Sequence, residues 1–119
     1  MENRNIKLSE IIKSFNIKVE CGQSLLNREV EGGYVSDLLS DVMAHSKKGD
    51  IWVTLQGHQN IVAVAKLKEI AGIIIVNGRK PEAETIKKAK GEGIPILTCD
   101  LPAFEIVGKL HKLGVSGTR

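Results

Sequence analysis

Polar side chains that could bind a small anion follow three apolar stretches of this 119-residue sequence. Each group comes directly after a run rich in Ile, Val or Leu, which is typical of a buried strand. If the three strands are parallel, their carboxyl ends meet at one edge of the sheet, where open α/β proteins bind ligands. The three groups are Thr54-Leu-Gln-Gly-His58, Val76-Asn-Gly78 and Thr98-Cys-Asp100.

Five residues in or beside these groups are candidate ligand contacts. Because backbone N–H groups at a helix N-terminus attract anions, His58 and Asn60 beside such a terminus could hold a phosphate. A simpler interpretation accounts for the same residues as a loop at His58, a helix cap at Asn60 and a turn at Asn77-Gly78. The candidates are Gln56, His58, Asn60, Asn77 and Gly78.

A second candidate begins at two adjacent glycines, Gly32-Gly33, which allow another backbone or a ligand to approach closely. The apolar residues that follow have the i, i+3, i+4, i+7 spacing of a helix with one buried stripe. They predict a helix that starts with Ser36 as its N-cap and carries pairs of serines and aspartates on its other face. The stripe is Val35, Leu38, Leu39, Val42 and Met43, and the pairs are Ser36 with Ser40 and Asp37 with Asp41.

Two aspartates one helical turn apart repel each other unless they are neutralised. Asp37 and Asp41 could bind a cation or pair with Arg28, or Asp37 could serve only the helix dipole while both stay in water. Because no third ligand has a suitable spacing, no metal site is predicted. Arg28 suits a carboxylate or phosphate partner, and the alternative is an exposed loop charge.

The motifs that would indicate catalysis are absent from the sequence. It contains no P-loop, no Gly-x-Gly-x-x-Gly fingerprint, no Gly-x-Ser-x-Gly elbow and no Ser-x-x-Lys pair. His45, His58 and His111 do not have metal-ligand spacings. We therefore predict neither an enzyme nor a cofactor.

Composition narrows the class of partner. Aromatic residues make up only 3% of the chain, and the lysines behind its net charge of +3 are scattered, so no nucleic-acid surface is expected. No apolar run approaches the ~20 residues of a membrane span, and no secretory signal is visible, so we expect a cytoplasmic protein that does not bind membranes. Cys21 and Cys99 are expected to be reduced, partly buried and without a metal.

Alternating strands and helices must position these residues. From residue 50 onward the pattern predicts strand, helix, strand, helix, strand, helix, which implies a parallel sheet with right-handed crossovers. The expected fold is α/β, a small sheet of mostly parallel strands flanked by helices. It forms one domain over residues 1–119, with a core at about 6–113 and a polar tail at 114–119. Strands are predicted at 17–19, 29–31, 51–55, 73–76 and 94–98, and helices near 8–15, 36–46, 61–70, 81–90 and 100–110.

Local signals refine these elements. Asn5 or Ser9 is expected to cap the first helix, and Gly72 to end the third. Pro95 indicates an edge strand or the start of a strand. Phe104, Val107 and Leu110 are expected to face the core, and the first ~30 residues to wrap one edge or add strands of their own.

The stretch from Asn27-Arg28 through Gly32-Gly33-Tyr34-Val-Ser-Asp-Leu-Leu-Ser-Asp41 resembles the DRTGG domain family. The likeness spans roughly residues 15–110 and continues through Gly49–Thr54, His58–Ala65, Ile73–Val76, Gly78 and Gly93–Ile96. It implies a fold similar to the N-terminal domain of HPr kinase and, more distantly, of the Mur ligases. Such domains are found beside CBS domains in regulated pyrophosphatases and in some phosphotransacetylases.

The match to the family's motif is incomplete. Arg28, Gly32, Gly33, Tyr34, Ser36 and Asp37 agree with it, whereas Asn27 replaces an aspartate and Glu31 replaces a threonine. A carboxylate in place of a hydroxyl weakens any anion site there. Free-standing copies are sometimes labelled serine kinases, but this chain has no P-loop domain.

The resemblance implies a regulatory or interaction module, often paired with itself, rather than an enzyme. We expect a homodimer formed through residues 32–41, which acts in signalling or in the control of a partner enzyme. The alternative is a sensor that binds a nucleotide or phosphate at the strand ends. A phosphotransfer enzyme that depends on His58 has the least support.

Overall fold

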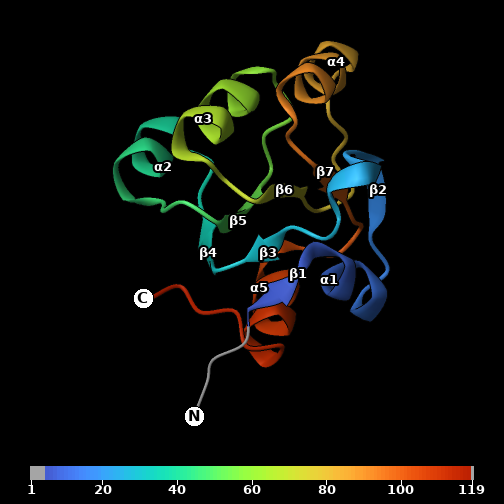
Figure 1. Cartoon of the computed structure of the whole chain (residues 1–119), viewed down its shortest axis with the longest axis vertical. Helices are drawn as coiled ribbons and strands as arrows, with labels where there is room; N and C mark the ends of the chain where they lie inside the picture. Colours follow the sequence, from blue (N-terminus) through green and yellow to red (C-terminus); the bar gives the residue numbers. More distant parts are fainter. Residues whose placement is uncertain (1–4, 119) are drawn as a thin grey trace.

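The computed structural model describes residues 5–118, and within them five α-helices accompany a five-stranded sheet and a two-stranded ribbon (Figure 1). The sheet has the order β2-β7-β6-β5-β4, and the ribbon pairs β1 with β3. The strands are β1 (Ile6–Lys7), β2 (Lys18–Cys21), β3 (Glu29–Val30), β4 (Gly32–Val35), β5 (Asp50–Thr54), β6 (Gly72–Ile75) and β7 (Ile96–Thr98). The helices are α1 (Leu8–Ser14), α2 (Leu39–His45), α3 (Asn60–Lys68), α4 (Ala83–Glu92) and α5 (Ala103–Lys112), with a 3-10 turn η1 (Gln23–Leu25).

The predicted α/β fold is confirmed. Strands β4, β5, β6 and β7 are parallel, and β2 joins β7 antiparallel at one edge. The expected alternation of strand and helix from residue 50 onward is present as β5-α3-β6-α4-β7-α5. Pro95 lies just before β7, which is an interior strand of the sheet. Of the two interpretations of Pro95, the start of a strand is therefore correct and the edge strand is wrong.

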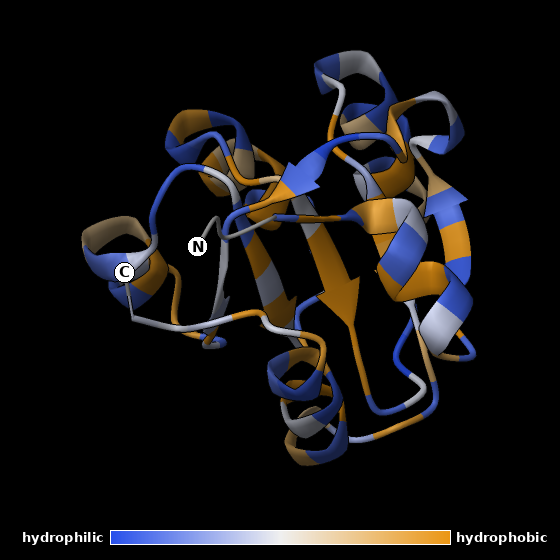
Figure 2. Cartoon of the chain, turned by 60° about the horizontal axis from the view of Figure 1, so that its bottom comes forward, coloured by the Kyte–Doolittle hydropathy of each residue, from blue (hydrophilic) through white to orange (hydrophobic). Residues whose placement is uncertain are grey.

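Helices cover both faces of the sheet. Helices α2, α3 and α4 lie on one face, and α1 and α5 lie on the other (Figure 1). Because side chains alternate along a strand, Ile73 and Ile75 join the core under α3, while Ile74 joins the core against α1 and α5. Figure 2 shows the resulting pattern, with apolar central strands and helices that are polar on the side away from the sheet.

The N-terminal third adds strands of its own, as expected. The β1–β3 ribbon lies beside α1, and β2 extends the sheet, where Glu20 accepts a 2.8 Å hydrogen bond from the Thr98 hydroxyl. The predicted caps at Asn5 and Ser9 are wrong. The backbone N–H of Lys7 instead donates to the Glu10 carboxylate at 3.2 Å, which satisfies one free donor at the start of α1.

The prediction of a helix directly after the glycine pair is wrong. Gly32 and Gly33 lie inside strand β4, paired in parallel with Asp50 and Ile51, and α2 starts only at Leu39. Of the expected stripe, Val42 is buried and Leu39 half-buried, whereas Val35 and Leu38 are 49% and 64% exposed and Met43 is also exposed. The periodic spacing arises by coincidence, because its first two members precede the helix.

Other element ends also differ from expectation. Asn60 is the first residue of α3 rather than its cap, and α3 ends at Lys68 because Glu69 adopts a left-handed conformation (φ 54°). Gly72, the expected end of that helix, begins β6. In α5, Ile106 and Leu110 face the core, whereas Phe104 is 87% exposed and Val107 is 38% exposed.

The C-terminal segment returns to the sheet. Val115 is buried, and the Ser116 carbonyl accepts a 3.0 Å hydrogen bond from the N–H of Gly33 on β4. Residues 1–4, and Arg119 at the end of the predicted tail, lie outside the described residues. Among the described residues, no helix is both long and apolar enough to cross a bilayer.

Candidate functional site

The carboxyl ends of β5 and β6 meet at one end of the sheet, as the sequence predicted for Thr54 and Asn77, and Asp37, which was expected on a helix, joins them there. They surround a pocket of about 210 Å³ together with the start of α5. Its lining is Val35, Asp37, Thr54, Leu55, Val76, Asn77, Pro102 and Ala103. The pocket is small and mostly apolar, with one carboxylate and one amide at its rim.

Asp37 connects the ends of β4 and β5. Its carboxylate accepts hydrogen bonds from the Thr54 hydroxyl at 2.8 Å and from the Leu55 N–H at 2.7 Å. The side chain of Gln56 donates to the Asp37 carbonyl at 3.1 Å. Asp37 precedes α2, and its carboxylate contacts the end of β5 rather than the N-terminus of that helix. Its negative charge at the pocket rim disfavours the binding of a phosphate.

The remaining strand-end candidates make local contacts. His58 accepts the backbone N–H of Asn60 through Nδ1 at 3.1 Å, and neither residue lines the 210 Å³ pocket. Asn77 and Gly78 have φ angles of 62° and 70°, and their N–H groups donate to Leu101 and Cys99 carbonyls. These contacts are those of a loop and a turn.

Tyr34 connects the edge strand β4 to helix α2. Its hydroxyl donates to the Asp41 carboxylate at 2.8 Å, and Nδ1 of His45 lies 3.0 Å from the same carboxylate. The Tyr34 hydrogen bond is the main cause that holds the pKa of Asp41 below its usual value, and in return it raises the pKa of Tyr34. Asp41 thus has its own partners, and it does not stack on Asp37.

The serines of the expected polar face are also separated. The Ser36 hydroxyl accepts the N–H of Leu38 at 3.2 Å, and the Ser36 carbonyl accepts the indole N–H of buried Trp52 at 2.9 Å. Ser40 is exposed on α2. Within residues 5–118, no group of three His, Cys, Asp or Glu side chains could hold a metal ion.

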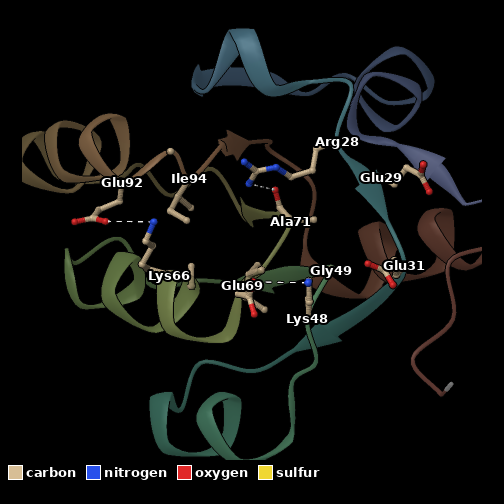
Figure 3. Close-up of a pocket in the computed structure, with 13 residues that line it drawn as sticks. Arg28, Glu29, Glu31, Lys48, Gly49, Lys66, Glu69, Ala71, Glu92 and Ile94 are labelled. Atoms are coloured by element: carbon tan, nitrogen blue, oxygen red, sulfur yellow. Dashed lines mark hydrogen bonds and ion pairs between the residues drawn. The ribbon is translucent and has the colours of Figure 1, made fainter.

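Arg28 lies at the opposite end of the sheet, where the parallel strands begin. It therefore does not pair with Asp37 or Asp41. Its guanidinium donates to the Ala71 carbonyl at 3.4 Å and lies in a pocket of about 430 Å³ (Figure 3). The charged residues of this pocket were not recognised from the sequence. They are Glu29, Glu31, Lys48, Lys66, Glu69 and Glu92, which come from four separate segments.

Comparison with protein families matches residues 10–113 to the DRTGG domain. The chain belongs to the DRTGG domain family. The family assignment made from residues 27–41 is thereby confirmed, and the matched region includes every strand of the main sheet.

A solved structure with this DRTGG fold is the crystal structure of the CBS and DRTGG domains of the regulatory region of Clostridium perfringens pyrophosphatase, complexed with its activator diadenosine tetraphosphate. It has a TM-score of 0.69 and 17% sequence identity, and the match covers 86% of this chain and 44% of that one. The DRTGG domain described here thus spans less than half of that regulatory region. The comparison with curated proteins found no significant match.

The motif residues of this DRTGG domain occupy two different places. Gly32, Gly33 and Tyr34 form the edge strand, and Ser36 and Asp37 connect it to the carboxyl-end pocket. Arg28 reaches the pocket at the other end of the sheet. The motif therefore does not form one compact site.

Proposed function

We propose that this DRTGG domain is a non-catalytic regulatory module that forms a homodimer through residues 32–41 and controls a partner enzyme. The observation that carries the proposal is the open side of edge strand β4. The strand pairs with β5 on one side only, and the C-terminal segment contacts its other side at Gly33. The end of the strand at Val35 remains exposed.

The backbone direction supports pairing with a second strand at this end. The N–H of Ser36 donates to the Val53 carbonyl, so the N–H of Val35, one residue earlier, points to the open side. Unpaired strand edges add strands from other chains. A second copy can pair antiparallel about a two-fold axis, because each copy supplies the same donors and acceptors.

Exposed apolar side chains flank the open strand. Val35 lines both the 210 Å³ pocket and a smaller apolar pocket of about 130 Å³, which Val107 also lines. Both valines are exposed, as is Leu38 directly after the strand. Burying these side chains in a dimer adds a hydrophobic contribution to the strand pairing.

Light scattering after size-exclusion chromatography tests the dimer. The wild type is expected to have twice the 13.0 kDa mass of the chain at high micromolar concentration. Val35→Glu should yield a monomer with an unchanged circular dichroism spectrum. Leu67→Glu is the matched control, since Leu67 is 68% exposed on α3, and it should remain dimeric. A monomeric wild type, or a dimeric Val35→Glu variant, would contradict the proposal.

A second candidate function is nucleotide sensing at the carboxyl-end pocket. Two observations favour it: the Asn77 amide at the pocket rim, and the activator bound to the Clostridium perfringens regulatory region. Thermal-shift measurements with ATP and diadenosine tetraphosphate test it, because a ligand at 100 times its Kd adds about 2.7 kcal/mol to the free energy of unfolding. The absence of a shift with both nucleotides would exclude this function.

A further inference from the structure

The largest pocket described above lies at the amino ends of the strands, at the opposite end of the sheet from the Asp37 pocket. Its volume of about 430 Å³ is within the range typical of small-molecule sites. Buried apolar residues form its floor, and turns at Gly49 and Gly93 form parts of its wall. The floor is Ala65, Ile70, Ala71 and Ile94.

Arg28 presents unused donors to this pocket. The guanidinium has five N–H donors, and its hydrogen bond to Ala71 is long, at 3.4 Å. Among residues 5–118, no carboxylate forms an ion pair with Arg28, although its side chain is partly buried. Figure 3 shows the guanidinium between Ala71 and Ile94, above the pocket floor. A partly buried guanidinium of this kind is suited to bind a planar carboxylate through two parallel hydrogen bonds.

The neighbouring lysines have carboxylate partners already. Lys66 lies 3.8 Å from Glu92, and Lys48 lies 3.8 Å from Glu69 (Figure 3). All four side chains of these ion pairs are exposed to water. Among the described residues that line this pocket, Arg28 is therefore the cation whose donors are available to a ligand.

The charge balance of the lining selects the class of ligand. Three cationic and four carboxylate side chains line the pocket, so its summed charge is slightly negative. A polyphosphate would be repelled by the carboxylates, whereas a single negative charge placed at Arg28 is attracted locally. The apolar floor can receive an uncharged ligand body.

We propose that this pocket binds a small molecule that carries one carboxylate on an apolar body, and that Arg28 receives the carboxylate through a bidentate pair of hydrogen bonds. The site can be tested separately from the dimer and from the nucleotide pocket, because its lining includes none of residues 32–41 and none of the residues around the carboxyl-end pocket.

The test is an NMR titration of the ¹⁵N-labelled full chain with three probes: benzoate, inorganic phosphate and ATP. Benzoate, a monocarboxylate with an apolar ring, should cause saturable shifts of the Gly49, Ala71 and Gly93 amides at concentrations up to about 20 mM, well above a Kd of ~1 mM. Phosphate should bind there more weakly, and ATP should leave these three amides unchanged. Shifts with ATP at these amides, or no saturable shift with benzoate, would overturn the proposal.

Two arginine variants distinguish specific binding of benzoate at Arg28 from a general attraction to positive charge. Arg28→Lys keeps the charge but loses the planar pair of donors, and should weaken benzoate binding about ten-fold. Arg79→Lys, at an exposed arginine outside this pocket, should bind like the wild type. Equal affinity in both variants would overturn the role of Arg28. If Arg28→Lys does not fold, the positions of the shifted amides in the wild type still decide the proposal.

Discussion

The Tyr34 hydroxyl donates a 2.8 Å hydrogen bond to the Asp41 carboxylate, and so ties the edge strand to the first turn of α2. The two residues are separated by a connection whose other contacts run to β5, through Asp37 and the Ser36 carbonyl. The end of β4 is thus held by side-chain hydrogen bonds rather than by a second neighbouring strand.

Replacing Tyr34 with Phe should make the free energy of unfolding change less between neutral and acidic pH. The folded-state pKa of Asp41 is lowered from 3.8, chiefly by this bond, so its contribution to stability is present above pH 3.8 and is lost as the pH falls through the lowered pKa. Urea unfolding at about pH 7 and about pH 3 measures the difference. The pH-dependent loss should be smaller in Tyr34→Phe, though not zero, because Ser36 and His45 also act on Asp41. Equal losses in both proteins would refute this.

Removing the Asp37 carboxylate should destabilise the carboxyl end of the sheet. Asp37→Ala leaves the buried Thr54 hydroxyl and the Leu55 N–H without their acceptor, at a cost of about 1–3 kcal/mol. Asp37→Asn keeps one oxygen and should cost less. Asp100→Ala is the control, since Asp100 is exposed at the end of β7, and its urea midpoint should match that of the wild type. Equal midpoints for Asp37→Ala and Asp100→Ala would contradict the assignment.

Gly33 and Val115 should be energetically coupled. A Cβ added at Gly33 would lie 3.2 Å from the Val115 Cγ1 atom, closer than a relaxed contact. Gly33→Ala should therefore destabilise the wild type but cost less in a Val115→Ala background, which lacks the Cγ1 methyl group. A double-mutant cycle measures the coupling, which we expect at about 0.5–1.5 kcal/mol. Additive effects would show that the C-terminal segment adjusts freely beside β4.

The two cysteines should react slowly in the folded chain. Cys21 and Cys99 are free and buried, and burial raises the pKa of both thiols, so little reactive thiolate is present near neutral pH. A colorimetric disulfide reagent should label both thiols rapidly in denaturant and slowly without it. Fast labelling of either residue under native conditions would show that this part of the sheet opens locally.

The second half of the fold was predictable because its signals are local. A run such as Ile73–Val76 has the composition of a strand covered on both faces, and the spacing to the next strand requires a helical crossover. The helix predicted at 81–90 was also found, two residues later at each end, as α4, and Gly93 with φ 70° follows its last residue. Each of these elements depends on residues next to one another in the chain.

Strand β4 could not be predicted in this way. Gly32 and Gly33 have low strand propensity, and they are part of a strand only because β5 supplies the pairing partner. Val35 and Leu38 fit a helical spacing by chance, and nothing local distinguishes an exposed valine on an edge from a buried one on a helix. Tertiary pairing overrides the local pattern here.

The candidate site was predicted in part. The sheet topology brings Thr54 and Asn77 together, which the order of strands implied, whereas Asp37 was expected on the face of a helix. The pocket around Arg28 was missed because Lys48, Lys66 and Glu92 come from distant segments that meet only in the folded chain. Their one sequence signal was the glycines at 49 and 93, which mark turns before β5 and β7, the two strands on either side of β6.

The pairing of β2 with β7 affects the order in which the sheet assembles during synthesis of the chain. Lys18 lies opposite Thr98, so the two partners are 80 residues apart in the sequence. At 5–20 residues per second, β2 waits about 4–16 seconds on the ribosome before its neighbour is synthesised. Over that interval β5 and β6 can assemble with α3 between them, while β2 has no strand to pair with. The order of synthesis thus places this edge of the sheet last in assembly, although it is encoded first.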